Sequence, residues 1–153
     1  MAGRFQGSAV VDRPIEEVFA FLAAGTNDPK FSPRVQEIRQ VTDGPVGAGT
    51  VFASTVKDAG MTTTREFELT EVNAPTTIRW AERSKNLVTA KSGGYDLAPE
   101  GAGTRVTIFN ELEGHGFGKL LAPLALRAAR KDADAFAQRI KRAIEAEPAP
   151  AAT

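Results

Sequence analysis

Apolar side chains near the end of the chain recur at steps of three and four residues over positions 117–147. The members of this stripe are Leu120, Leu121, Leu124, Ala128, Phe136, Ile140 and Ile144. This spacing places them on one face of a long helix, with lysine and arginine filling much of the remainder. One helix of this length cannot bury its apolar face alone, so we expect a curved sheet to cover it and to enclose a pocket.

Most of the chain between residues 35 and 113 has the pattern of β-strands. Short runs rich in glycine, proline, aspartate and asparagine separate them, and connections this short favour an antiparallel meander over parallel units. The expected strands are residues 35–42, 50–57, 62–72, 77–82, 87–97 and 104–112. Alternation is clearest at 62–69, where Arg65, Phe67 and Leu69 share one face.

The N-terminal part predicts a strand at 5–11 and then a helix through residue 24. Pro14 stands at the first helical position, where its missing N–H costs least. Residues 25–29 end this helix, and 30–33 have room for at most one more turn. We expect one domain over residues 1–147, followed by a disordered Pro/Ala tail at 148–153.

This order of elements resembles the START-like, birch-pollen-allergen-like (SRPBCC) superfamily, and local motifs resemble its polyketide cyclase/dehydrase branch. The branch's opening motif, its turn between the second and third strands and its last hairpin are similar to residues 10–22, 44–52 and 94–107. The likeness covers about residues 4–146. It implies a bacterial-type α+β helix-grip fold, in which a seven-stranded curved antiparallel sheet grips the long C-terminal helix and two short helices follow the first strand.

Composition narrows the function classes. Nineteen basic residues balance nineteen acidic ones, so no charge excess points to nucleic acid. The absence of cysteine excludes disulfides and thiolate sites, and a single histidine, His115, leaves us expecting no metal and no cofactor. No apolar run approaches about 20 residues, so we expect a cytoplasmic protein without stable membrane insertion. The glycine-rich loop 44–49 precedes a strand rather than a helix, which favours tight turns over a phosphate cradle.

Inward-facing strand positions give the candidate ligand site. Together with three helix residues they are Phe52, Ser54, Arg65, Phe67, Trp80, Tyr95, Ile108, Asn110, Leu121, Leu124 and Ala128. An apolar cavity with a few polar groups is the usual form of a small-molecule site. Arg65 would hold a carboxylate or enolate oxygen, and Lys91 shares the phase of Tyr95. The alternatives are that the aromatic residues only pack the core and that Arg65 reaches water at a strand end.

The candidate catalytic residues are Arg65, Tyr95, Asp132 and His115. Asp132 interrupts the apolar stripe; buried, it would need a partner such as Arg65, but placement at the helix edge beside Arg127 or Lys131 is favoured. His115 lies between two glycines, which favours a solvent-facing or lid position over a catalytic one. We also expect Pro123 to kink or break the helix near Ala122.

Three functions remain open from these residues. The first is binding of a small hydrophobic or amphipathic molecule, such as a lipid, polyketide or isoprenoid, in the cavity between sheet and helix. The second, suggested by the resemblance, is a polyketide aromatase/cyclase: Arg65 and Tyr95 would polarise carbonyls while Asp132 or His115 accepts a proton during aldol closure and dehydration. The third is that side chains fill the cavity and the domain works through a protein surface instead. The ligand, the pathway and the oligomeric state stay open.

Overall fold

A computed structural model describes residues 2–58 and 60–148. The elements are β1 (Ala2–Val11), α1 (Ile15–Ala23), the 3₁₀ helix η1 (Gly25–Lys30), β2 (Val35–Gln40), β3 (Val51–Asp58), β4 (Met61–Asn73), β5 (Thr77–Glu82), β6 (Val88–Glu100), β7 (Gly103–Gly114) and α2 (Gly118–Glu145). The predicted helix-grip fold is confirmed, with element ends within a few residues of those expected. Residues 149–153 of the predicted tail lie outside the described part.

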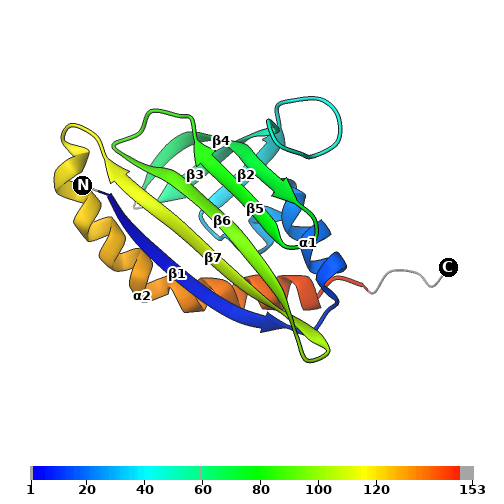
Figure 1. Cartoon of the computed structure of the whole chain (residues 1–153). Helices are drawn as coiled ribbons and strands as arrows, with labels where there is room; N and C mark the ends of the chain where they lie inside the picture. Colours follow the sequence, from blue (N-terminus) through cyan, green and yellow to red (C-terminus); the bar gives the residue numbers. More distant parts are fainter. Residues whose placement is uncertain (1, 59, 149–153) are drawn as a thin grey trace.

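The seven strands form one antiparallel sheet in the order β1-β7-β6-β5-β4-β3-β2. The first and last strands are therefore neighbours, and the remaining strands follow as a meander. Figure 1 shows α2 running alongside β1, with α1 at the opposite end of the sheet from the start of α2. Helix α1 therefore lies at one end of the inner face, and the start of α2 lies at the other.

At Gly7, the contact between α2 and β1 is made by small residues. A Cβ atom placed on Gly7 would lie 2.3 Å from the backbone oxygen of Ala133, so the strand and the helix approach at backbone distance. Small residues also form the buried side of the first half of α2, where Gly118 and Ala122 are buried. The predicted apolar stripe is therefore wrong for this half: Leu120 and Leu124 point away from the sheet.

Helix α2 runs from Gly118 to Glu145 without interruption, although Pro123 lies inside it. The expected break near Ala122 is absent. Pro123 stands in the second turn, where its missing N–H removes only the bond to the carbonyl of Lys119. The helix remains one rigid element above the sheet.

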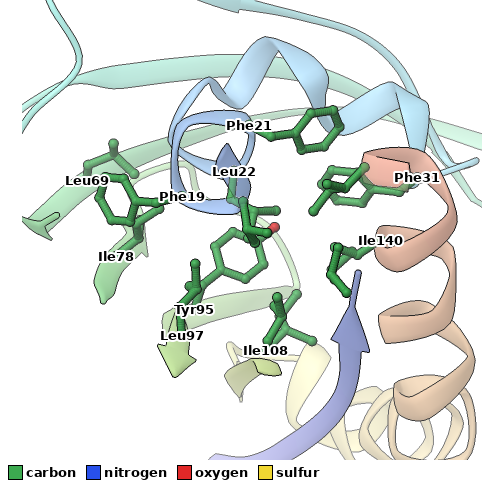
Figure 2. Close-up of a cluster of buried hydrophobic side chains, with 14 of the residues drawn as sticks. Phe19, Phe21, Leu22, Phe31, Leu69, Ile78, Tyr95, Leu97, Ile108 and Ile140 are labelled. Carbon is green, nitrogen blue, oxygen red and sulfur yellow. The ribbon is translucent and has the colours of Figure 1, made fainter. Parts of the chain in front are cut away.

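Side chains fill the inner face at the end next to α1 (Figure 2). The labelled members of this cluster are Phe19, Phe21, Leu22, Phe31, Leu69, Ile78, Tyr95, Leu97, Ile108 and Ile140. The ring of Phe31 lies 6.2 Å from that of Phe21 and 5.8 Å, edge-on, from that of Phe136. Close packing of this kind supplies the main apolar core.

A bulge in β6 changes the face that Lys91 occupies. The register with β7 shifts between Ala90 and Ser92. One extra residue turns the following side chain to the other face of the sheet. Lys91 is therefore exposed and lies 3.8 Å from Glu113, rather than sharing the inner face with Tyr95 as the alternation predicts.

Candidate functional site

Half-exposed polar and aromatic side chains line the inner face at the end away from α1. The register places Ser54 opposite Arg65, and Phe67 opposite both Phe52 and Glu82. Arg65, Phe67, Trp80 and Asn110 are only partly buried, in contrast to the residues of the core cluster. Antiparallel neighbours on one face lie within side-chain reach, so these residues form one continuous surface, which we take as the candidate site.

The centre of this surface is an ion pair between Arg65 and Glu82. Nη1 of Arg65 donates to both carboxylate oxygens of Glu82, at 2.9 and 3.1 Å, and to the carbonyl of Val88 at 3.2 Å. The Glu82 side chain is 0% exposed, against 26% for Arg65. Burying a carboxylate requires hydrogen bonds for its remaining lone pairs.

Three further donors meet that requirement. Ser84 Oγ, Asn86 Nδ2 and the backbone N–H of Ala90 donate to Glu82 at 2.6, 2.9 and 2.9 Å. The bulge of β6 begins at Ala90, so it directs this N–H at the carboxylate. Glu82 is therefore fixed, and it fixes one nitrogen of Arg65 in turn.

The rest of the Arg65 guanidinium has no partner among the residues that the structure describes. Within residues 2–58 and 60–148, nothing accepts a hydrogen bond from its Nε or Nη2. A guanidinium offers five N–H donors in a rigid plane and suits acceptor oxygens arranged in a fork. The group is thus held by Glu82 and has donors left for a ligand.

Beside it, Trp80 and Asn110 form an aromatic and amide surface over Gly93. The indole Nε1 of Trp80 donates to Asn110 Oδ1 at 2.9 Å, and its ring meets that of Tyr95 edge-on at 4.9 Å. A Cβ on Gly93 would lie 2.1 Å from Asn110 Oδ1 and 2.4 Å from Trp80 Nε1. Gly93 therefore provides the space that this pair occupies.

Tyr95 belongs to the core and not to the exposed part of the site (Figure 2). Burial, together with the negative charge of Asp28, raises the pKa of Tyr95 well above its ordinary value. The hydroxyl is neutral at every physiological pH, and its ring serves as packing for Trp80.

Asp28 is a titratable group that the sequence did not single out. It lies in η1, and no described residue donates a hydrogen bond to its carboxyl group. Burial raises the pKa of Asp28 to about 7. In the sequence, an aspartate before proline in a helix-ending segment indicates a turn, and no local pattern marks its side chain as inward-facing.

The other two candidate catalytic residues lie away from Arg65. Asp132 is half-exposed and accepts from Arg139 Nη2 at 2.8 Å, a hydrogen bond that lowers the pKa of Asp132. Its partner is thus Arg139 and neither Arg127 nor Lys131. His115 is exposed, with Nε2 2.8 Å from Thr89 Oγ1.

The remaining predicted ligand residues fall into two environments. Phe52, Ser54 and Ile108 are buried, whereas Leu121, Leu124 and Ala128 on α2 are exposed. Two surface depressions stand out, and neither includes Arg65. One of about 290 Å³ lies over β2, β3 and β4, and one of about 410 Å³ lies between η1 and the end of α2. Arg65 itself lies on a partly exposed face of the sheet, outside both depressions.

The described residues hold no cluster of three or more histidine, aspartate or glutamate side chains placed to bind a metal ion. None of the described helices is long and apolar enough to cross a bilayer.

A family model described as polyketide cyclase/dehydrase and lipid transport matches residues 2–145, nearly the entire chain. The chain belongs to this family. No curated protein matches it by sequence. The family's description covers both catalysis and transport, so membership alone does not choose between them.

Several solved structures have a fold similar to that of this family member. The Zhui aromatase/cyclase from Streptomyces sp. R1128 has a TM-score of 0.79 at 16% identity, over 95% of this chain and 94% of its own. A START superfamily protein from Mycobacterium smegmatis has 0.78 at 12%, over 93% and 97%. Ara h 8.0201 has 0.69 at 19%, over 96% and 100%. At such identities the likeness shows the fold.

Proposed function

We propose that the protein binds a small hydrophobic or amphipathic ligand on the half-exposed inner face between the sheet and α2, with Arg65 as its polar anchor. The observation that carries this proposal is the Arg65–Glu82 pair: Nη1 is fixed by a fully buried carboxylate, while Nε and Nη2 keep donors for which no described residue is an acceptor. Phe67 and Trp80 supply apolar and aromatic contact beside it.

The pairing with Glu82 also favours a particular ligand chemistry. Because Glu82 neutralises the charge of Arg65, the pair offers directed N–H donors with little net positive charge. The negative charge of Glu82 would repel a carboxylate ligand, whereas a neutral carbonyl carries no net charge to be repelled. The proposed ligand is therefore a flat or elongated apolar molecule carrying a ketone or ester oxygen, as in a polyketide or an isoprenoid.

The alternative function, a polyketide aromatase/cyclase, needs a proton acceptor beside the bound carbonyl. Arg65 would polarise that carbonyl. Tyr95 is buried and neutral, Asp132 is paired with Arg139, and His115 contacts Thr89. Since no contact joins any of these groups to Arg65, binding without turnover is the better supported proposal.

Native mass spectrometry of freshly purified protein, followed by titration, tests the proposal. A co-purified mass would identify the ligand class directly. Quenching of Trp80, the single tryptophan of the chain, would then compare a hydroxyanthraquinone with a long-chain fatty acid. We expect the ketone probe to bind and Arg65→Ala to weaken it about tenfold, since hydrogen bonds from a charged donor contribute about 1.5–3 kcal/mol.

A matched control is Arg83→Ala, which removes an exposed arginine 3.5 Å from Glu68 and should leave the affinity unchanged. If Arg65→Ala does not fold, the joint variant Arg65→Met with Glu82→Leu removes both charges and keeps the volume. Aromatic product formed from a poly-β-ketone thioester would replace the binding proposal with the cyclase alternative. If no mass co-purifies and no probe quenches Trp80, ligand binding on this face is refuted.

A further inference from the structure

The first two turns of α2 expose large apolar side chains. Phe117 and Leu120 are each 69% exposed, Leu124 66% and Leu121 38%. Their spacing of three, four and seven residues places them on one face, opposite the buried Gly118 and Ala122. We call these four residues the α2 patch. Single exposed leucines are common, but a contiguous group of this size marks an interaction surface.

Leu87, 48% exposed, lies just before β6, and its backbone packs against Gly118 at the start of α2. Its carbonyl accepts a 2.8 Å hydrogen bond from the backbone N–H of His115, directly before α2. The next residue, Val88, accepts the bond from Arg65 at 3.2 Å. The α2 patch therefore lies at the same end of the molecule as the proposed ligand site (Figure 1).

The charges around the α2 patch have one sign. Between residues 117 and 131 the chain has no acidic residue and four exposed basic ones, Lys119, Arg127, Arg130 and Lys131, although its overall formal charge is zero. Arg127 and Lys131 follow Leu124 at three and seven residues and so continue the same helix face. In the part of the chain that the structure describes, Lys119, Arg127 and Lys131 have no ion-pair partner.

One acidic side chain at this end, Glu113 of β7, already has partners. Glu113 lies 3.8 Å from Lys91 and 3.8 Å from His115. The basic residues of the helix are therefore available to an external anion.

We propose that the α2 patch docks on the surface of an anionic lipid bilayer. The helix would lie in the plane of the interface, with Phe117, Leu120 and Leu124 at the boundary of the acyl chains and Arg127 and Lys131 among the phosphates. Apolar burial and attraction of basic residues to anionic lipid act together in such interfacial helices. The helix lies on the bilayer and does not cross it.

Charge argues against a second copy of this chain as the occupant. In a two-fold symmetric contact the same patch meets itself. That arrangement would bring Arg127 and Lys131 of one copy against those of the other, with no acidic residue of the helix start to compensate. An anionic surface has the complementary charge.

The test is co-flotation of the intact protein with vesicles of phosphatidylcholine alone and of an equal mixture with phosphatidylglycerol. We expect binding to the mixed vesicles only, weakened by added salt. Leu120→Asp with Leu124→Asp should weaken binding at least about tenfold, because both apolar contacts are replaced by negative charges that the anionic lipid repels. Arg127→Gln and Lys131→Gln should each weaken it about fivefold.

Val41→Asp is the matched control, since Val41 is 44% exposed after β2 and far from α2 in sequence. Circular dichroism establishes whether each variant is folded. If the double leucine variant is unfolded, Arg127→Gln and Lys131→Gln still test the proposal. Absence of binding to the mixed vesicles, or equal loss for the control, would overturn the proposal. So would a dimer in light scattering that Leu120→Asp dissociates. Vesicle binding and quenching of Trp80 by soluble probes are separate measurements, so failure of one proposal is distinguishable from failure of the other.

Discussion

Trp80 on β5 and Asn110 on β7 are joined by a 2.9 Å hydrogen bond that crosses the strand between them. The residue beneath the bond is Gly93 of β6, which the register places opposite both. Three consecutive strands thus fix the one indole of the chain on the inner face. Its fluorescence consequently reports on the proposed ligand site.

Gly93→Ala should displace this indole. The added Cβ would stand 2.1 Å from Asn110 Oδ1 and 2.4 Å from Trp80 Nε1, so both side chains must move. We expect a red-shifted tryptophan emission and a loss of about 1–3 kcal/mol in the free energy of unfolding, measured by urea denaturation. Asn110→Ala removes only the hydrogen bond and should cost about 1 kcal/mol. A Gly93→Ala variant with the emission of the parent would contradict the steric explanation.

Gly7→Ala tests the close contact between β1 and α2. The new methyl group would meet the backbone oxygen and carbon of Ala133 at 2.3 and 2.5 Å, and backbone atoms of a packed helix cannot turn aside. We expect a loss of about 1–3 kcal/mol in the free energy of unfolding. Gly47→Ala is the control, because nothing lies within 4 Å of its Cβ and the same chemical change should be tolerated there. If both variants unfold at the same urea concentration, the contact is looser than described.

Glu82→Gln should be costly because it removes the fully buried carboxylate and leaves the partly buried Arg65 without its counter-charge. Removing one member of a buried ion pair costs about 3–5 kcal/mol, which urea denaturation would measure. Glu68→Gln, at a partly exposed pair with Arg83, should change stability by less than about 1 kcal/mol. The joint variant Arg65→Met with Glu82→Leu should recover most of the loss. Persistent instability of the joint variant would assign the effect to the hydrogen bonds of Ser84 and Asn86 instead.

The elements of this fold were predictable because alternation and turn residues are local signals. Arg65 was found in the same way, from its phase in β4. The phase of Lys91 was wrong because a bulge shifts the register by one residue, and nothing in residues 87–97 marks it. Leu120 and Leu124 have helical spacing but face outward, since the close approach of Gly118 to the backbone of Leu87 selects small residues for the buried side at the start of α2. Glu82 was missed because its burial depends on donors from three other segments.

Asp28 predicts how stability depends on pH. Its pKa is about 7 in the folded protein and near 3.8 when unfolded, so between these values the folded state binds more protons. Stability contributed by this group is therefore highest below about pH 4 and falls as pH rises to 7, with a slope of up to about 1.4 kcal/mol per pH unit. Asp28→Asn removes the slope, so the variant should gain stability relative to the parent as pH rises from 4 to 8 in urea denaturation.

Asp132→Asn is the control of opposite sign. The hydrogen bond from Arg139 lowers the pKa of Asp132, so the ionised carboxylate stabilises the fold above the ordinary pKa of aspartate, and this contribution is lost as pH falls below it. The variant should be less stable than the parent at neutral pH and approach it in acid. Because the two variants carry the same chemical change, opposite trends isolate the environment as the cause. A stability difference between Asp28→Asn and the parent that does not vary with pH would mean that solvent reaches the Asp28 carboxyl group freely.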